Sequence, residues 1–264
     1  MIVTYQSFEE FPGWDKAPEL FKSLIAEYLS KCILEVGSGA NPTLPAGSIL
    51  ENDLSYVTSD LSLTELEKAD PVFQRVVLDL SAKAIDPSLT ESFDCVLSRM
   101  VGEHICDGRQ FHQNIYKILR PGGISVHCFS TLWSLPFAIN RLLPDPITDR
   151  LLNRFAPRDE DLHGKFKAYY SWSRGPSKKM IRRFEMLGFE VIRYNGYFGH
   201  QYYRPRLPWL QRMEDWKSRL LLKHPVPQLC SYAMLVLRKP HSLSDSSPSS
   251  IRKQNEDAAC STHS

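Results

Sequence analysis

The chain has 264 residues, of which 42% are hydrophobic and 23% charged, and its formal net charge is +2 at pH 7. A chain of this length and composition can bury a full hydrophobic core, and so small a charge excess does not indicate a nucleic-acid partner. No apolar run reaches the roughly 18 residues of a membrane-spanning helix, and no basic stretch followed by an apolar one begins the chain as in a secretory signal. The six cysteines show no CxxC spacing, which favours reduced, buried thiols and a cytoplasmic location.

Strand and helix signals alternate along the chain. A first helix is expected at residues 18–30, where apolar side chains recur at helical spacing. Two later helices are expected at 108–119, closed by the Arg-Pro-Gly-Gly run, and at 177–187, closed by Gly188. Short apolar runs predict strands at 31–36, 56–59, 75–78, 93–97, 124–129, 190–194 and 232–237. Such alternation is typical of a doubly wound, mostly parallel sheet with helices on both faces.

The segments outside this alternation divide the chain into parts. We expect one domain over residues 1–240, with its ligand-binding core at 31–130 and cap insertions after the fifth strand at 131–174 and 197–228. The Ser-rich tail at 241–264 is expected to be disordered. The second insertion is aromatic and basic, which is typical of a solvated basic face and also of a surface that attracts an anionic substrate or contacts a membrane peripherally.

A glycine-rich turn follows the first buried strand in the sequence ILEVGSGANP. Gly37 and Gly39 permit a sharp turn and a close approach of a ligand to the backbone. Asn41 and Pro42 are suited to the N-cap and first position of a helix, and the amides of the turn would then face a ligand that carries polar oxygens. A turn of this kind also occurs for structural reasons alone.

An acidic residue follows at the spacing of a ribose-binding site. Asp60 ends the strand YVTSD about twenty residues after Gly39, where a carboxylate can accept both hydroxyls of a ribose. Its alternative role is to cap the helix that follows, and the two roles are compatible. Pro42 occupies the third glycine position of a dinucleotide fingerprint, which argues against a ligand with a pyrophosphate.

The segment from about residue 32 to 130 resembles the class I, Rossmann-like S-adenosylmethionine-dependent methyltransferases, especially their small-molecule group. The resemblance rests on ILEVGSG, YVTSDLS, VVLDLS, SFDCVLSRMVGEHI and ILRPGGISV in this order. It implies a seven-stranded sheet with a reversed last strand, and S-adenosyl-L-methionine as the cofactor.

The resemblance also implies roles for individual residues. Glu35, Gly37 and Gly39 would border the methionine moiety, with the acid reaching its amino group directly or through water. Asp60 would hold the ribose. The remaining positions are Leu61 and Leu80 against the adenine, Asp79 facing its amino group, and Ser98 and Arg99 beside the reactive methyl.

The acceptor chemistry is less defined. His104 is the leading candidate for a general base that would activate a hydroxyl, with a structural or cofactor-side role as its alternative, whereas His127 is expected to be a core residue. No metal-ligand spacing is present, so we expect no catalytic metal. Aromatic residues in the insertions favour a small, apolar or aromatic, or lipid-like acceptor, although they would also pack a cap onto the sheet.

Three other functions compete with methyl transfer. A non-catalytic partner subunit that retains the cofactor pocket is one, because no convincing base is visible. A nicotinamide-dependent oxidoreductase is disfavoured by Pro42 and by the lack of a Tyr-x-x-x-Lys pair. RNA methylation has no recognisable nucleic-acid motif to support it.

Overall fold

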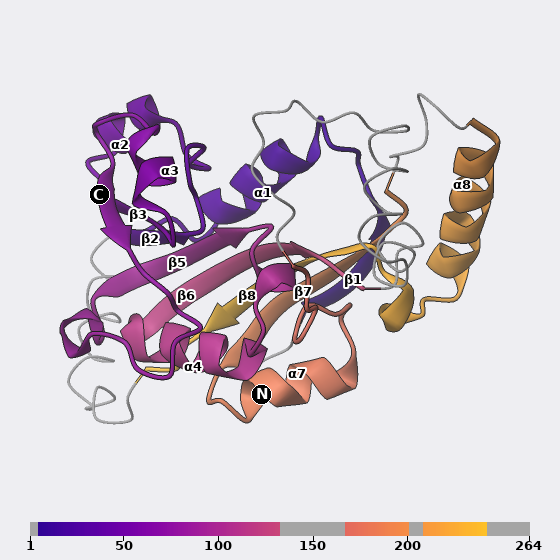
Figure 1. The fold of residues 1–264 in the computed structure, drawn as a ribbon. Helices are drawn as coiled ribbons and strands as arrows, with labels where there is room; N and C mark the ends of the chain where they lie inside the picture. Colours follow the sequence, from indigo (N-terminus) through magenta and orange to yellow (C-terminus); the bar gives the residue numbers. More distant parts are fainter. Residues whose placement is uncertain (1–4, 133–166, 201–207, 242–264) are drawn as a thin grey trace, which may run out of the picture.

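The computed structural model describes residues 5–132, 167–200 and 208–241, and in these ranges the chain forms one mixed sheet with helices on both faces (Figure 1). The strands are β1 (Tyr5–Glu10), β2 (Cys32–Val36), β3 (Ser55–Asp60), β4 (Gln74–Val77), β5 (Phe93–Arg99), β6 (Leu119–Ser130), β7 (Glu190–Phe198) and β8 (Tyr232–Arg238). The α-helices are α1 (Ala17–Ala26), α2 (Ala46–Glu51), α3 (Leu63–Glu67), α4 (Gly108–Ile118), α7 (Lys178–Glu185) and α8 (Pro208–Lys223). Short 3-10 turns are η1 (Pro87–Leu89), η2 (Gly102–His104) and η3 (Pro227–Leu229). None of the described helices is long and apolar enough to cross a lipid bilayer.

The strand order is β1-β7-β8-β6-β5-β2-β3-β4. All neighbouring strands are parallel except β8, which is antiparallel to both β6 and β7. The predicted mostly parallel sheet with a reversed last strand is therefore confirmed.

The sheet has eight strands, one more than predicted, because β1 adds to its edge beside β7. The residues of β1 pair in parallel from Tyr5 opposite Arg193 to Glu10 opposite Phe198. Its sequence, YQSFEE, is mostly polar and gives no apolar run. The strand is held by hydrogen bonds to one neighbour and by stacking of Phe8 on Phe198, with ring centroids 5.7 Å apart. An edge strand of this kind leaves little trace in a hydrophobicity pattern.

Two apolar layers lie on the two faces of the sheet. On one face α1 packs through Phe21, Leu24 and Ile25, all buried. On the other, α4 and α7 pack through a second set of buried side chains that includes Phe111, Ile115, Ile118, Met180 and Phe184. Inward side chains of the parallel strands alternate between the two layers, so each central strand is buried on both sides.

Several predicted boundaries move in the structure. The helix after the glycine turn does not begin at Pro42 with Asn41 as its cap; α2 begins at Ala46, with Pro45 before it. The first helix ends at Ala26, before the predicted 30. The Arg-Pro-Gly-Gly run already belongs to β6, where Gly122 has φ +82° and its N–H donates to the carbonyl of Lys239.

The two predicted insertions are described only in part. Most of the first, residues 133–166, lies outside the described residues, as do 201–207 of the second and the tail from 242. In the second insertion, β7 extends to Phe198 and α8 follows beside β1 and β7. Figure 1 shows α8 as the outermost helix at that end of the sheet, far from α2 and α3.

Candidate functional site

The order of the strands reverses between β2 and β5. From β2 the chain continues outward to β3 and β4, whereas from β5 it continues to β6 on the other side. At such a switch point the connections leave in opposite directions and open a crevice beyond the carboxyl ends of the strands, where α/β proteins bind ligands. The turn after Val36 and the end of β5 at Ser98 and Arg99 border this crevice, since Val36 and Ser98 are paired in the sheet.

The glycine turn after β2 depends on left-handed backbone conformations. Gly37 has φ +67° and Gly39 φ +49°, values that residues with a Cβ adopt only with strain. The N–H groups of Gly37 and Ser38 donate to the carbonyl of Ser59 at 2.7 and 3.1 Å, so these two amides tie the turn to β3. The prediction that the amides of the turn face a ligand is therefore wrong for these two. The amides of Gly39 and Ala40 donate to no described residue.

Asp60, at the end of β3, lies next to this turn. A Cβ atom placed on Gly39 would be 3.5 Å from its Oδ2, so the carboxylate and the turn border the same space. Its other oxygen, Oδ1, accepts a hydrogen bond from the N–H of Ser62 at 3.1 Å. The cap of α3 is Ser62, whose hydroxyl accepts from the N–H of Glu65. The capping role therefore belongs to Ser62, and Oδ2 of Asp60 accepts from no described residue.

Glu35 is buried beneath the turn and has a structural role that its sequence position did not reveal. Its carboxylate accepts hydrogen bonds from the N–H of Thr43 at 2.9 Å, the hydroxyl of Thr43 at 2.5 Å and the hydroxyl of Tyr56 at 2.6 Å. Burial raises the pKa of this carboxyl, against the lowering effect of these donors. Both oxygens are thus engaged within the protein. Glu35 therefore fixes the loop that follows the turn, and its contact with an amino group of the cofactor, directly or through water, stays a prediction.

The two leucines predicted to contact the adenine have opposite environments. Leu61 follows Asp60 and is 69% exposed, whereas Leu80 is 2% exposed and lies in the core layer beneath α4. The structure thus gives Leu80 a core role, and its packing on a ligand ring stays a prediction. Asp79 is exposed, as its role requires, and its Oδ1 accepts from the N–H and hydroxyl of Ser81 at 2.8 and 2.6 Å.

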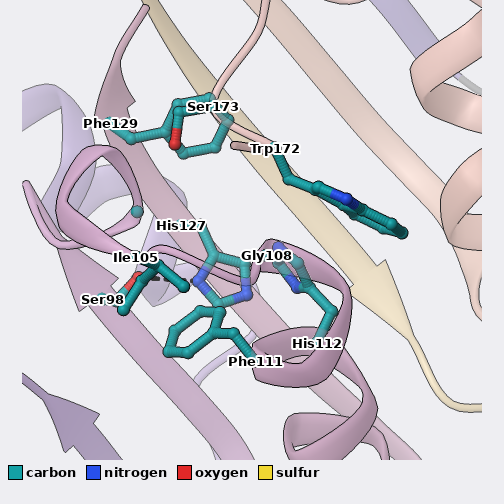
Figure 2. Close-up of a pocket in the computed structure, with 10 residues that line it drawn as sticks. Ser98, Ile105, Gly108, Phe111, His112, His127, Phe129, Trp172 and Ser173 are labelled. Carbon is teal, nitrogen blue, oxygen red and sulfur yellow. Dashed lines mark hydrogen bonds between the residues drawn. The ribbon is translucent and has the colours of Figure 1, made fainter. Parts of the chain in front are cut away.

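Ser98 is buried below the rim of the crevice. Its hydroxyl lies 2.7 Å from Nδ1 of His127, and Figure 2 shows Ser98 and His112 on opposite sides of the His127 ring. These residues line a cavity of about 10 Å³ together with Trp172 and Ser173. That volume is at the lower limit for one water molecule. The hydroxyl of Ser98 is thus engaged inside the protein, and the position of Ser98 and Arg99 beside the reactive methyl stays a prediction. His127 is a core residue, as predicted.

The turn after β5 combines a strained backbone with a buried acid. Met100 has φ +58°, in a region that side chains other than glycine rarely adopt, and such strain is found more often at functional sites. Glu103 is buried, and its Oε1 accepts from the hydroxyl of Ser130 at 2.9 Å while its Oε2 has no partner among the described residues. Burial raises the pKa of this carboxyl. No role for either residue is predicted from the sequence, because backbone strain and side-chain burial leave no mark in a single sequence.

His104 lies in η2 at the same rim and is half-buried. Its Nδ1 is 3.3 Å from the carbonyl oxygen of Lys167, which belongs to the described end of the first insertion. His104 is therefore within reach of the crevice edge, and its role as a base stays a prediction. In the described ranges no three His, Cys, Asp or Glu side chains are placed together to hold a metal ion.

Comparison with known proteins places these residues in a family context. A model of the methyltransferase domain matches residues 34–127, the part of the chain that forms the glycine turn, Asp60 and the β5 rim. Comparison with curated protein sequences gives no match.

Several solved structures have the same fold. A phosphoethanolamine N-methyltransferase 2 from Haemonchus contortus, in complex with S-adenosyl-L-methionine, is 16% identical to this chain, with a TM-score of 0.52. The match covers 88% of the present chain and 54% of the Haemonchus contortus chain, so the present chain spans about half the length of that protein. A sarcosine dimethylglycine methyltransferase homologue from Galdieria sulphuraria has 12% identity and a TM-score of 0.52, covering 85% of this chain and 86% of its own. The [4+2]-cyclase SpnF has 14% identity and a TM-score of 0.51, covering 90% and 87%.

The strand order, the switch-point crevice and the domain match agree with one another. At these levels of identity the solved structures establish the fold, and the match over residues 34–127 identifies the domain. The chain therefore carries a methyltransferase domain and has the Rossmann-like fold of the class I S-adenosylmethionine-dependent methyltransferases.

Proposed function

We propose that this protein transfers a methyl group from S-adenosyl-L-methionine to a small-molecule or lipid-like acceptor. The observation that carries the proposal is the juxtaposition of Gly39 and Asp60 at the switch point, where a left-handed backbone leaves room for a ligand beside a carboxylate oxygen that accepts from no described residue. A methyltransferase domain of this fold implies S-adenosyl-L-methionine as the cofactor.

The described residues of the crevice fit such a cofactor. Oδ2 of Asp60 can accept from a ribose hydroxyl, and the amides of Gly39 and Ala40 can donate to a ligand carboxylate or hydroxyl. Exposed Leu61 offers an apolar surface next to Asp60 for a base, and exposed Asp79 can accept from an exocyclic amino group. Within the described turn only the amides of Gly39 and Ala40 are available to a ligand, too few for a pyrophosphate, which favours this cofactor over a dinucleotide.

The bound cofactor supplies an already activated methyl group, so the protein has to hold the acceptor in line with it and exclude water. Residues at the end of β5 and in η2 are the part of the chain that borders this position, because β5 lies next to β2 across the switch point. If the acceptor is a hydroxyl, His104 in η2 is the proposed base, since it lies at this rim.

The names of two similar structures support a small acceptor. The Haemonchus contortus protein is a phosphoethanolamine methyltransferase, and one of its structures contains phosphomonomethylethanolamine. The Galdieria sulphuraria protein is named for sarcosine and dimethylglycine. These acceptors belong to those proteins. For this chain they support the class of a small molecule over a nucleic acid.

Calorimetric titration of the full chain with S-adenosylmethionine, S-adenosylhomocysteine and NADH tests the cofactor. We expect binding of the first two, and Asp60→Ala should weaken it by roughly 10- to 150-fold, the loss of hydrogen bonds to a charged group. Asp86→Ala is the matched control, because Oδ1 of Asp86 accepts from the N–H two residues later as Asp60 does, but at the distant η1. Binding of NADH alone, or equal effects of the two substitutions, would contradict the proposal.

Transfer itself is tested separately from binding. Cell extract is incubated with the protein and S-adenosylmethionine labelled in its methyl group, and label in small molecules or lipids is counted with wild-type protein and with Asp60→Ala. Label that depends on the wild-type protein supports methyl transfer. Tight cofactor binding without any transfer of label would identify a non-catalytic binding protein instead.

A further inference from the structure

Helix α8 exposes an apolar stripe along its length. Trp209, Met213, Trp216 and Leu220 are 62%, 58%, 66% and 47% exposed. Their spacing of four, three and four residues places all of them on one face of a helix. Two tryptophans and two aliphatic side chains in one row differ from the scattered apolar residues that any surface carries.

The buried face of α8 is largely polar, so the helix is turned with its apolar stripe outward. Gln211, Glu214 and Ser218 are only 4%, 3% and 1% exposed, and with Leu221 they form the side that packs on the protein. Glu214 is paired with Lys217 at 2.5 Å. A helix that needed only to stabilise the fold would bury its tryptophans, because burial of large aromatic side chains is favourable. The outward stripe is therefore available to a binding partner outside the described part of the chain.

Basic side chains lie beside the stripe. Arg212, Arg219 and Lys223 are exposed. Helix α8 has two carboxylates: that of Glu214 is buried, and that of Asp215 is half-buried and accepts a hydrogen bond from Gln211 at 2.7 Å. The exposed side of α8 thus carries cations and no fully exposed carboxylate. Figure 1 shows that no described element lies on the outer side of this helix.

We propose that α8 binds the surface of an anionic lipid bilayer, lying in the plane of the interface. Tryptophan rings are enriched at the level of the lipid headgroups, and basic residues beside an apolar stripe are attracted to anionic headgroups. A lipid surface accounts for both parts of the pattern, because anionic headgroups lie directly beside an apolar layer, whereas a protein partner would have to supply an apolar groove with an acidic border. The helix would enter to the depth of its apolar face, without crossing the bilayer.

Vesicle binding by the full chain tests this proposal. Co-sedimentation is measured with vesicles of phosphatidylcholine alone and with vesicles that also contain phosphatidylserine. We expect binding to the anionic vesicles, with a blue shift of tryptophan emission, and at least about a tenfold loss of partitioning in the double variant Trp209→Ser/Trp216→Ser. The control is Leu50→Ser/Met186→Ser, which removes two apolar side chains of similar exposure, 68% and 70%, from other elements.

A charge variant separates the electrostatic contribution of the basic side chains from the apolar contribution of the stripe. Arg212→Glu/Arg219→Glu should abolish the preference for anionic vesicles, and added salt should weaken binding of the wild-type protein in the same direction. Absence of vesicle binding by the wild-type protein, or an equal loss in the Leu50→Ser/Met186→Ser control, would overturn the proposal. So would a wild-type protein that elutes as a dimer while the tryptophan variant elutes as a monomer, because the stripe would then be a subunit interface. Thermal unfolding of each variant confirms that it is folded.

Discussion

The hydroxyl of Ser98 lies 2.7 Å from Nδ1 of His127, and the two residues are direct partners across β5 and β6. The other ring nitrogen of His127 and Nδ1 of the neighbouring His112 are buried and have no hydrogen-bond partner. The two imidazole rings have centroids 5.2 Å apart in a nearly perpendicular arrangement. Burial lowers the pKa of His127 to about 3 and that of His112 well below its usual value, so both rings stay neutral in the folded protein.

This pair should make the fold sensitive to acid. Between the ordinary histidine pKa of 6.5 and about 3, the unfolded chain binds a proton at position 127 that the folded chain does not bind. The free energy of unfolding therefore falls as the pH falls through this window, by up to about 1.4 kcal/mol per pH unit for one histidine. His127→Gln should show a shallower decline between pH 6.5 and pH 5, measured by urea denaturation at each pH.

Ser98→Ala is the control for that experiment. It removes the hydrogen bond but leaves His127 buried, and burial is the cause of the lowered pKa. Its decline with acid should match that of the wild-type protein, even if its free energy of unfolding is lower at every pH. The buried carboxyls Glu35 and Glu103 act in the opposite direction, because a raised pKa favours the folded state as the pH falls, and they are common to all three proteins. A wild-type slope in His127→Gln would contradict the prediction.

The glycine turn should tolerate no side chain at its first position. A Cβ on Gly37 would lie 2.4 Å from Cγ2 of Val101, and φ is +67° there. Gly37→Ala should therefore lower the free energy of unfolding by about 2–4 kcal/mol, from backbone strain and overpacking together. Val101→Ala in the same chain should recover the steric part of this loss, and a double-mutant cycle by thermal unfolding measures it.

A second glycine provides the comparison. Gly47 lies inside α2, and a Cβ there would meet no atom within 4 Å. Gly47→Ala should leave stability unchanged or raise it by up to about 1 kcal/mol, because alanine favours a helix. If Gly37→Ala and Val101→Ala were simply additive, the contact between the two positions would not be the cause of the loss.

Much of the fold and part of the site follow from sequence patterns. Runs such as CILEV and CVLS are mainly apolar on both faces of an extended chain, which favours a strand buried on both sides. The spacing of Gly39 and Asp60 predicts that the two residues lie close together, because a parallel sheet brings the carboxyl ends of neighbouring strands to the same edge. The missed strand β1 has no such run, since it is stabilised by pairing with β7.

Other features depended on contacts that no local pattern encodes. Pro42 suits the first turn of a helix, but the carboxylate of Glu35 accepts from both the N–H and the hydroxyl of Thr43, and the helix begins only at Ala46. Helix α8 lies in a segment predicted only as an aromatic and basic cap insertion, and no local pattern says that its apolar stripe faces outward. That orientation depends on which residues meet β1 and β7.

The structural role of Glu35 leads to a prediction that separates it from cofactor binding. Glu35→Gln retains an oxygen for the N–H of Thr43 and the hydroxyl of Tyr56, and its amide can donate to the hydroxyl of Thr43. We expect a loss of stability below about 1 kcal/mol and nearly unchanged affinity for S-adenosylmethionine. Glu35→Ala leaves these donors buried without an acceptor and should cost about 2–5 kcal/mol. A large loss of affinity in Glu35→Gln at unchanged stability would show that the carboxylate contacts the cofactor after all.

The two leucines next to the predicted cofactor acids provide the last test. Leu80→Ala opens a cavity in the core beneath α4 and should lower the free energy of unfolding by about 2–5 kcal/mol. Leu61→Ala removes an exposed side chain, so stability should change by less than about 0.5 kcal/mol, while affinity for S-adenosylmethionine falls several-fold if this side chain covers the adenine. Thermal unfolding and calorimetric titration of both variants measure the two effects independently. A stable Leu80→Ala variant with weakened binding would place Leu80, and not Leu61, against the ligand.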